Sequence, residues 1–113
     1  MECTFEEQGD VLKVVLDGRF VAACSDEIRE RVTKRAEGFS KIVFDLSKMT
    51  HIDSSGLGVL VRLLKQAQED GVQMRLAGLQ PHPQMVFDIT KVYRLFEICE
   101  TVEAAMASFG DNA

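Results

Sequence analysis

The stretch that decides the fold covers residues 49–58 and reads Met49-Thr50-His51-Ile52-Asp53-Ser54-Ser55-Gly56-Leu57-Gly58. It follows the apolar run Ile42-Val43-Phe44, which is typical of a strand covered on both faces. It precedes an apolar-periodic segment from Leu57 to about Asp70, which indicates a helix. We therefore expect a connection that leads from a buried strand into the N-terminus of a helix.

Two serine hydroxyls lie at this predicted helix start. Asp53 and the serines are residue types whose side-chain oxygens accept from free N–H groups of a first helical turn. Gly56 and Gly58 are poor helix formers and are expected to leave backbone N–H groups of that turn accessible. Because a helix N-terminus stabilises negative charge, a phosphoryl group on Ser54 or Ser55 would be tolerated and would present about −2 charge to a partner. A plain helix cap is the alternative interpretation of the same residues.

The run from Ile52 to Gly58, placed after Ile42-Val43-Phe44-Asp45-Leu46, resembles the signature of STAS domains and, more narrowly, that of bacterial anti-sigma factor antagonists. In that family the serine directly after the aspartate is phosphorylated. This maps onto Ser54, with Ser55 as the alternative, and Asp53, Gly56 and Gly58 would support the site. The resemblance extends from about residue 11 to residue 109 and is most specific over residues 42–58. It departs at Phe20-Val21, where the family commonly carries a Leu-Asp-like pair.

Length and composition indicate a single domain. The chain has 113 residues, of which 46% are hydrophobic and 27% charged. We expect one STAS domain over residues 1–113, with a core at about 3–109 and a frayed tail at 110–113. No apolar run approaches the roughly 18 residues of a membrane-spanning helix, and the first four residues lack the character of a signal peptide. A cytoplasmic protein without membrane insertion is the expectation.

Charge and cysteine usage narrow the classes of partner. The net charge of −5 argues against a nucleic-acid ligand. Cys3, Cys24 and Cys99 show no metal-ligand spacing, so reduced thiols and no metal site are expected. The acidic surface and the lack of a long exposed strand pattern favour a monomer.

The hydrophobic pattern predicts the element order ββαβαβαβα, and hence an α/β fold of the STAS type with a mixed sheet of about five strands and about four helices. Gly9-Asp10 predicts an N-terminal β-hairpin, and Asp17-Gly18 the end of its second strand. Residues 47–53 are expected to be a loop. Val86 and Ile89 are expected on the apolar side of the helix at 83–90. The predicted strands are 3–8, 11–17, 41–46, 72–77 and 96–99, and the helices are 22–37, 57–70, 83–90 and 101–108.

The helix after the signature has a wide apolar arc. Its expected core positions are Leu57, Leu60, Val61, Leu64 and Ala67. Val59 and Leu63 widen this arc, and Arg62 lies on the remaining face. Burial of the wide arc is the preferred interpretation. If one edge is exposed, Val59, Leu63 and Arg62 are candidate contacts for a partner.

Other chemistries fit the sequence less well. A nucleophile elbow requires Gly-x-Ser-x-Gly, and the window around Ser54 has only the second glycine. A general base is not assured, because His51 is close to Ser54 in sequence but lies on a strand-to-helix turn that does not guarantee a side-chain contact, and His82, between two prolines, is expected to be exposed. A phosphate-binding loop motif and a metal-ligand pattern are both missing. We therefore expect no catalytic residues, no cofactor and no enzymatic activity.

The resemblance implies a partner-switching cycle. The unphosphorylated protein would bind an anti-sigma factor that is also a GHKL-type serine kinase. Phosphorylation of Ser54 would release it, and a PPM-type serine phosphatase would reverse the modification. Two alternatives stay open: a STAS scaffold or regulatory subunit of a transporter or sensory complex, and a module that binds a small ligand or nucleotide at the helix N-terminus.

Overall fold

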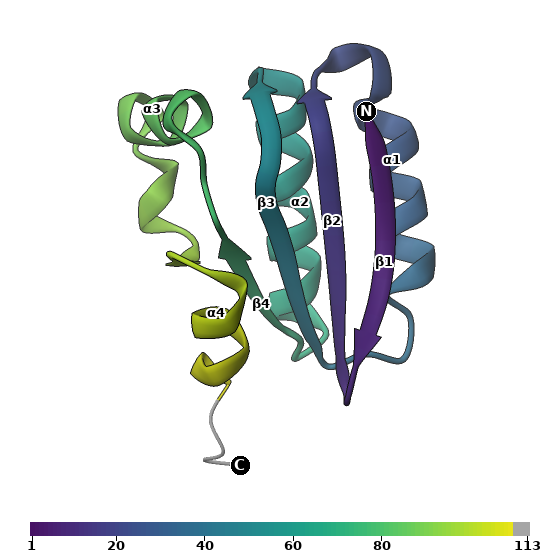
Figure 1. Ribbon diagram of the computed structural model, residues 1–113. Coiled ribbons are helices and arrows are strands. Elements are labelled where there is room, and N and C mark those ends of the chain that lie inside the picture. The colour runs from purple at the N-terminus through teal and green to yellow at the C-terminus, as the bar shows by residue number, and fades with distance from the viewer. Residues whose placement is uncertain (110–113) are drawn as a thin grey trace.

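The computed structural model describes residues 1–109, which form a central sheet with helices on both faces (Figure 1). The tail expected at residues 110–113 lies outside the described residues. In chain order the elements are β1 (Glu2–Gln8), β2 (Val11–Phe20), α1 (Ala22–Arg35), β3 (Lys41–Ile52), α2 (Ser54–Glu69), β4 (Gln73–Ala77), α3 (Pro81–Thr90), the 3-10 turn η1 (Val92–Arg94), β5 (Glu97–Cys99) and α4 (Val102–Ser108).

The five strands follow one another across the sheet in the order β1-β2-β3-β4-β5. β1 and β2 are antiparallel and joined by a tight turn in which Gly9 has φ 62°, so the predicted hairpin is confirmed. The pairs β2-β3, β3-β4 and β4-β5 are parallel, and a helical segment connects each of them. The expected α/β class with a mixed five-stranded sheet is confirmed.

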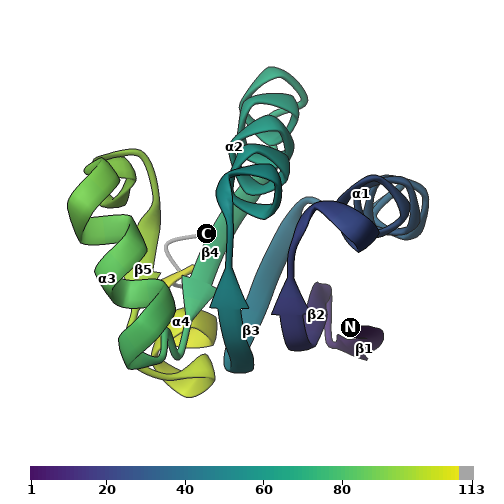
Figure 2. The same cartoon turned by 90° about the horizontal axis from the view of Figure 1, so that it is seen from above.

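Helices cover the sheet unequally. α1 and α2 lie side by side on one face, and α4 lies on the opposite face (Figure 2). The larger core fills the space beneath α1 and α2, and its fully buried members include Leu12, Phe20, Phe44, Leu60 and Phe87. A smaller core beneath α4 is formed by Val11, Val43, Ala77, Ala105 and Phe109. The alternation of strand residues between the two cores follows the pleat of the sheet.

Two strands are longer than expected, which corrects the prediction of a loop over residues 47–53. β2 passes through Asp17 and Gly18 and ends at Phe20, with register shifts between Val15 and Asp17 and between Gly18 and Arg19. β3 continues to Ile52 beside it. The polar residues between 47 and 51 hid this extension, because the shifted register interrupts the regular alternation of inward and outward side chains.

The helix α3 also differs from expectation. It begins at Pro81 rather than Pro83, and a proline is well suited to the first turn because its missing N–H has no partner there. Pro83 and Phe87 form its buried side, and the Phe87 ring lies 5.8 Å from that of Phe96. Ile89, expected to face the core, is 73% exposed.

Helix α2 begins at Ser54, three residues earlier than predicted, so Gly56 lies inside its first turn. Gly56 is buried, and a Cβ at this position would collide with the carbonyl oxygen of Phe20 and lie 3.0 Å from its carbonyl carbon. Gly58 is exposed, and a Cβ there would meet nothing within 4 Å. The expectation that both glycines expose backbone N–H groups is wrong for Gly56, whose hydrogen side chain lets α2 approach the end of β2.

The two glycines form a matched pair for a stability test. Gly56→Ala forces α2 away from Phe20, and we expect a loss of about 1–3 kcal/mol in the free energy of unfolding, as is usual for overpacking. Gly58→Ala adds a methyl group in open space and removes a poor helix former, so we expect a gain of up to about 1 kcal/mol. Urea unfolding of both variants measures the difference. Equal effects would contradict the close approach at Gly56.

Candidate functional site

The candidate site lies where the carboxyl end of β3 meets the N-terminus of α2. In parallel α/β sheets, ligands and partners commonly meet the protein at the carboxyl ends of the strands. Three further segments meet here, namely the end of β2, the start of α1 and the start of α3, and Asp53 connects β3 to α2. Residues 52–58, singled out by the sequence, therefore lie together at one end of the sheet.

Asp53 is the N-cap of α2 and joins three elements. Its Oδ1 accepts hydrogen bonds from the backbone N–H groups of Ser55 (2.9 Å) and Gly56 (3.0 Å), which have no partner within the helix. Its Oδ2 accepts from the N–H of Ala22, the first residue of α1 (3.0 Å). Its own N–H donates to the carbonyl of Phe20 at the end of β2 (3.2 Å). One side chain thus fixes the starts of both helices.

The same contacts lower the pKa of Asp53. The hydrogen bond from the Gly56 N–H has the largest effect, and those from Ala22 and Ser55 act in the same direction. Partial desolvation opposes them by favouring the neutral acid, but the pKa still lies below its usual value. The carboxylate is therefore charged at neutral pH, as its role as an acceptor of three N–H groups requires.

The two serines are not the cap. Ser54 is the first residue of α2 and is exposed, whereas Ser55 is half-buried. Within residues 1–109, neither hydroxyl makes a hydrogen bond to another protein group, because Asp53 already satisfies the amides that a capping hydroxyl would reach. Ser54 is thus the more accessible of the two residues.

The candidate partner contacts on α2 differ in their exposure to solvent. Val59 is only 4% exposed and packs in the core, so its suggested role as a partner contact is wrong and the preferred alternative of burial holds. Leu63 is half-buried and Arg62 is exposed. Both line a groove of about 290 Å³ between α1 and α2, together with Arg29 and Lys65.

A histidine pair at the site was not expected from the sequence. His51, predicted to lie in a loop, is the penultimate residue of β3, and His82 lies in the first turn of α3. Their ring centroids are 4.6 Å apart. Because 31 positions separate them, no local pattern could have indicated the contact.

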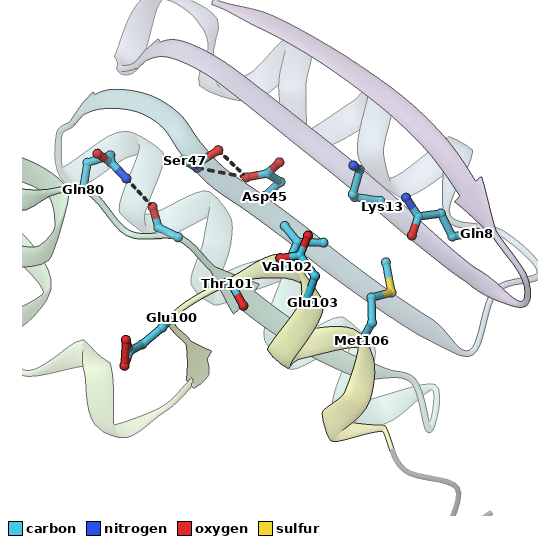
Figure 3. A pocket seen from close by; sticks show the side chains of 11 residues that line it. Gln8, Lys13, Asp45, Ser47, Gln80, Glu100, Thr101, Val102, Glu103 and Met106 are labelled. Carbon is cyan, nitrogen blue, oxygen red and sulfur yellow. Dashed lines mark hydrogen bonds between the residues drawn. The ribbon is translucent and has the colours of Figure 1, made fainter.

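A separate cavity of about 690 Å³ lies on the opposite face of the sheet, beside α4 (Figure 3). Some of its polar side chains already have partners. Lys13 pairs with Glu6 at 3.3 Å, and the Ser47 hydroxyl donates to Asp45 at 2.7 Å. This cavity has no wall in common with the Ser54 site.

Two features are missing from the part of the chain that the structure describes. No helix within residues 1–109 is long and apolar enough to cross a bilayer. The same residues contain no cluster of three or more histidine, cysteine or carboxylate side chains suited to a metal ion.

Substitutions at Asp53 test the cap and its charge. At pH 7 we expect Asp53→Ala to lose about 1 kcal/mol in the free energy of unfolding, the usual cost of removing an N-cap. Because the folded-state pKa is lowered, this stabilisation is fully present above the unfolded-state pKa of about 3.9 and is lost as pH falls through the folded-state value.

Urea unfolding at pH 7 and pH 3 measures this effect. Asp53→Asn keeps a neutral acceptor oxygen, so it controls for the charge and should show a smaller loss without the same pH dependence. A gap between wild type and Asp53→Ala that stays constant across this range would contradict the role of the carboxylate charge.

Comparison with solved structures shows the same fold in several proteins. The chain superimposes on an anti-sigma factor antagonist from Mycobacterium paratuberculosis with a TM-score of 0.86, at 17% identity and with 95% of this chain and 92% of that chain covered. The unphosphorylated form of the anti-sigma factor antagonist SpoIIAA gives a TM-score of 0.72 at 16% identity, with 96% and 97% covered. These likenesses establish the fold.

Sequence comparison gives the family. BtrV of Bordetella bronchiseptica is 27% identical over 110 residues, covering 96% of this chain and 95% of its own. A STAS-domain containing protein of Pseudomonas aeruginosa is 30% identical over 90 residues, covering 80% and 89%. The anti-sigma-B factor antagonist of Bacillus subtilis is 25% identical over 95 residues, covering 84% and 87%. The sequence model of the STAS domain matches residues 2–105, and the chain therefore belongs to the STAS domain family.

Proposed function

We propose that this protein is an anti-sigma factor antagonist that switches partners when Ser54 is phosphorylated. In the unphosphorylated state it binds an anti-sigma factor that is also a GHKL-type serine kinase, and it leaves that partner once Ser54 carries phosphate. The observation that carries the proposal is the exposed Ser54 hydroxyl at the start of α2, in a member of the STAS family whose relatives include an anti-sigma-B factor antagonist.

The hydrogen bonds of Asp53 determine where a phosphate on Ser54 would lie. The N–H groups of Ser55 and Gly56, which could otherwise hold an anion at the helix start, already donate to Asp53. The negative Asp53 carboxylate also repels a second anion from the same place. The phosphate would therefore extend outward, where the helix dipole still tolerates it and a bound partner would meet it.

Release of the partner then follows from local electrostatics. A phosphate of about −2 charge, placed in an interface formed around a neutral hydroxyl, loses its hydration and meets groups arranged for a smaller, uncharged side chain. A cost of about 2.8 kcal/mol weakens binding a hundredfold, since about 1.4 kcal/mol corresponds to tenfold. No rearrangement of the fold is needed for an effect of this size.

The chemistry of the cycle belongs to the partners. The kinase supplies ATP and magnesium, and a PPM-type phosphatase removes the phosphate. This protein contributes only the acceptor hydroxyl and acts in the cytoplasm. In support, the two imidazoles near the site pair with each other, and neither makes a hydrogen bond to Ser54 among residues 1–109 that would make it a general base.

A STAS scaffold in a membrane transporter is the second candidate. The fold also occurs in the murine anion transporter Slc26a9, with a TM-score of 0.74 at 20% identity, and 89% of this chain covers 18% of the transporter. In that role the partner would be retained whatever the state of Ser54. The same experiment therefore separates the two functions.

The central test compares two neighbouring serines. Ser54→Asp should abolish capture of the kinase partner from a lysate of the native host while leaving the melting temperature nearly unchanged, because the exposed hydroxyl has no internal partner. Ser55→Asp is the control for added charge, and mass spectrometry identifies the captured proteins. If wild type and Ser54→Asp captured the same transporter or sensor proteins, the result would contradict the switch and support the scaffold function.

A second test identifies the acceptor. Ser54→Ala should bind the partner and take up no phosphate from it, because the acceptor oxygen is missing. Incorporation of labelled phosphate into the Ser54→Ala and Ser55→Ala proteins is the measurement. Labelling of Ser54→Ala but not of Ser55→Ala would assign the site to Ser55.

A third test concerns the groove between α1 and α2, which Arg62 lines about two helical turns along α2 from Ser54. Arg62→Glu reverses an exposed charge beside Leu63, and we expect at least tenfold weaker partner binding with an unchanged melting temperature. Arg94→Glu makes the same change of charge at an exposed position on η1 and serves as the matched control. Equal losses in both variants would indicate a general effect of net charge and would exclude a contact at Arg62.

A further inference from the structure

The two histidines of this chain come together at the carboxyl end of β3. His51 approaches from β3 and His82 from the first turn of α3, and both residues are exposed. Their ring centroids are 4.6 Å apart, and the ring planes are tilted by 51°, so the rings are not stacked in parallel. The proposed phosphorylation of Ser54 assigns no role to this pair.

The neighbours of His51 determine which of its nitrogens is available. The Thr50 hydroxyl donates its only proton to the carbonyl of Gly18 at 3.2 Å. Thr50 Oγ1 also lies 3.0 Å from His51 Nδ1, and with its proton already used it can only accept there. We infer from this network that Nδ1 carries the ring proton of His51, which leaves the lone pair on Nε2.

This is the arrangement that metal-binding histidines adopt. A histidine ligand usually donates its non-coordinating N–H to a neighbouring acceptor, which fixes the tautomer and the orientation of the ring. Here Thr50, itself anchored to Gly18 on the adjacent strand, supplies that acceptor. His51 is therefore oriented by the sheet as a ligand through Nε2.

The spacing of the two rings suits one shared ion. A metal ion about 2.0–2.1 Å from a ring nitrogen lies about 3.2 Å from the ring centroid, so two ligands at angles from about 90° (tetragonal) to about 109° (tetrahedral) place their centroids about 4.5–5.2 Å apart. The observed 4.6 Å falls within this range. Imidazole nitrogen is a preferred ligand of Zn²⁺, Cu²⁺ and Ni²⁺ and a poor one for Mg²⁺ and Ca²⁺.

We propose that His51 and His82 form a two-histidine site for a divalent transition-metal ion of the Ni²⁺, Cu²⁺ or Zn²⁺ class, bound by one nitrogen of each ring and completed by water. No third protein ligand joins them within residues 1–109. The nearest carboxylate in the sequence, Asp53, is occupied by three backbone N–H groups. Two ligands and open water positions make a site of modest affinity that exchanges its ion readily.

The test uses untagged protein and Ni²⁺ as the probe. We expect saturable one-to-one binding by calorimetry, with at least tenfold weaker binding for His51→Gln and for His82→Gln. Because the chain has only two histidines, its NMR spectrum contains the imidazole C–H signals of these two rings alone, and both rings should respond together. Affinity should follow Cu²⁺ above Ni²⁺ and Zn²⁺, with Mn²⁺ weakest, and Mg²⁺ should not compete.

Two further variants test whether the oriented imidazoles, rather than the cysteine thiols, bind the ion. Thr50→Val removes the hydroxyl oxygen that orients His51. Because Thr50 is exposed, we expect roughly tenfold weaker Ni²⁺ binding at an unchanged melting temperature. The double variant Cys24→Ser/Cys99→Ser should bind Ni²⁺ as the wild type does. The proposal would be overturned if His82→Gln bound Ni²⁺ as tightly as the wild type, if the cysteine variant lost Ni²⁺ binding, or if no saturable binding occurred at all. In the last case the two histidine rings would only pack against each other.

The site is independent of the proposed switch. Metal binding is measured on unphosphorylated protein without a partner, so its failure would leave the role of Ser54 untouched. Conversely, a protein that keeps its partner after Ser54→Asp could still bind Ni²⁺ through the two histidines.

Discussion

The hydrogen bonds accepted by Asp53 hold the functional end of the molecule together. One carboxylate satisfies N–H groups at the starts of two helices, α1 and α2, that otherwise have no acceptor. Because Asp53 performs the capping that a serine could also perform, the adjacent Ser54 is left with an exposed hydroxyl and no internal task. The structural role and the proposed signalling role are thus assigned to neighbouring residues, and a change in the second need not disturb the first.

Backbone contacts of Phe20 also hold the start of α2 in place. Its carbonyl accepts from the N–H of Asp53, and the same peptide group lies against Gly56 of α2. Both contacts require β2 to extend past its register shifts to Phe20. The position of α2, and hence of Ser54, is therefore set by the end of β2 as well as by β3, which leads into the helix.

Sequence reasoning succeeded where local patterns carry the information. The apolar run around Val43 predicted the central strand, and Asp53 and Ser54 before the apolar-periodic segment predicted the helix start to within three residues. It failed where tertiary contacts decide. The outer half of β3 carries polar residues such as Thr50 and His51, whose place in a strand depends on the irregular pairing with β2.

Hydrophobic periodicity also could not predict which apolar side chains of α2 and α3 are exposed. The apolar arc of α2 could not show whether Val59 or Leu63 faces solvent, because that depends on how closely α1 lies beside it. In α3 the larger ring of Phe87 takes the buried position and leaves Ile89 outside. The contact between His51 and His82 joins two elements that only the folded sheet brings together.

The parallel pairing of β2 with β3 also affects the rate of folding. It joins residues about thirty positions apart, such as Val11 and Lys41, so the intervening chain with α1 must close into a loop before the ladder can form. Non-local pairing of this kind slows folding relative to helical domains of similar length. Phe20 and Ile52 form the last rung of that ladder, directly before Asp53. Ser54 therefore reaches the geometry described only after this non-local pairing has formed, and under the proposed switch a kinase that recognises this geometry would act on folded chains.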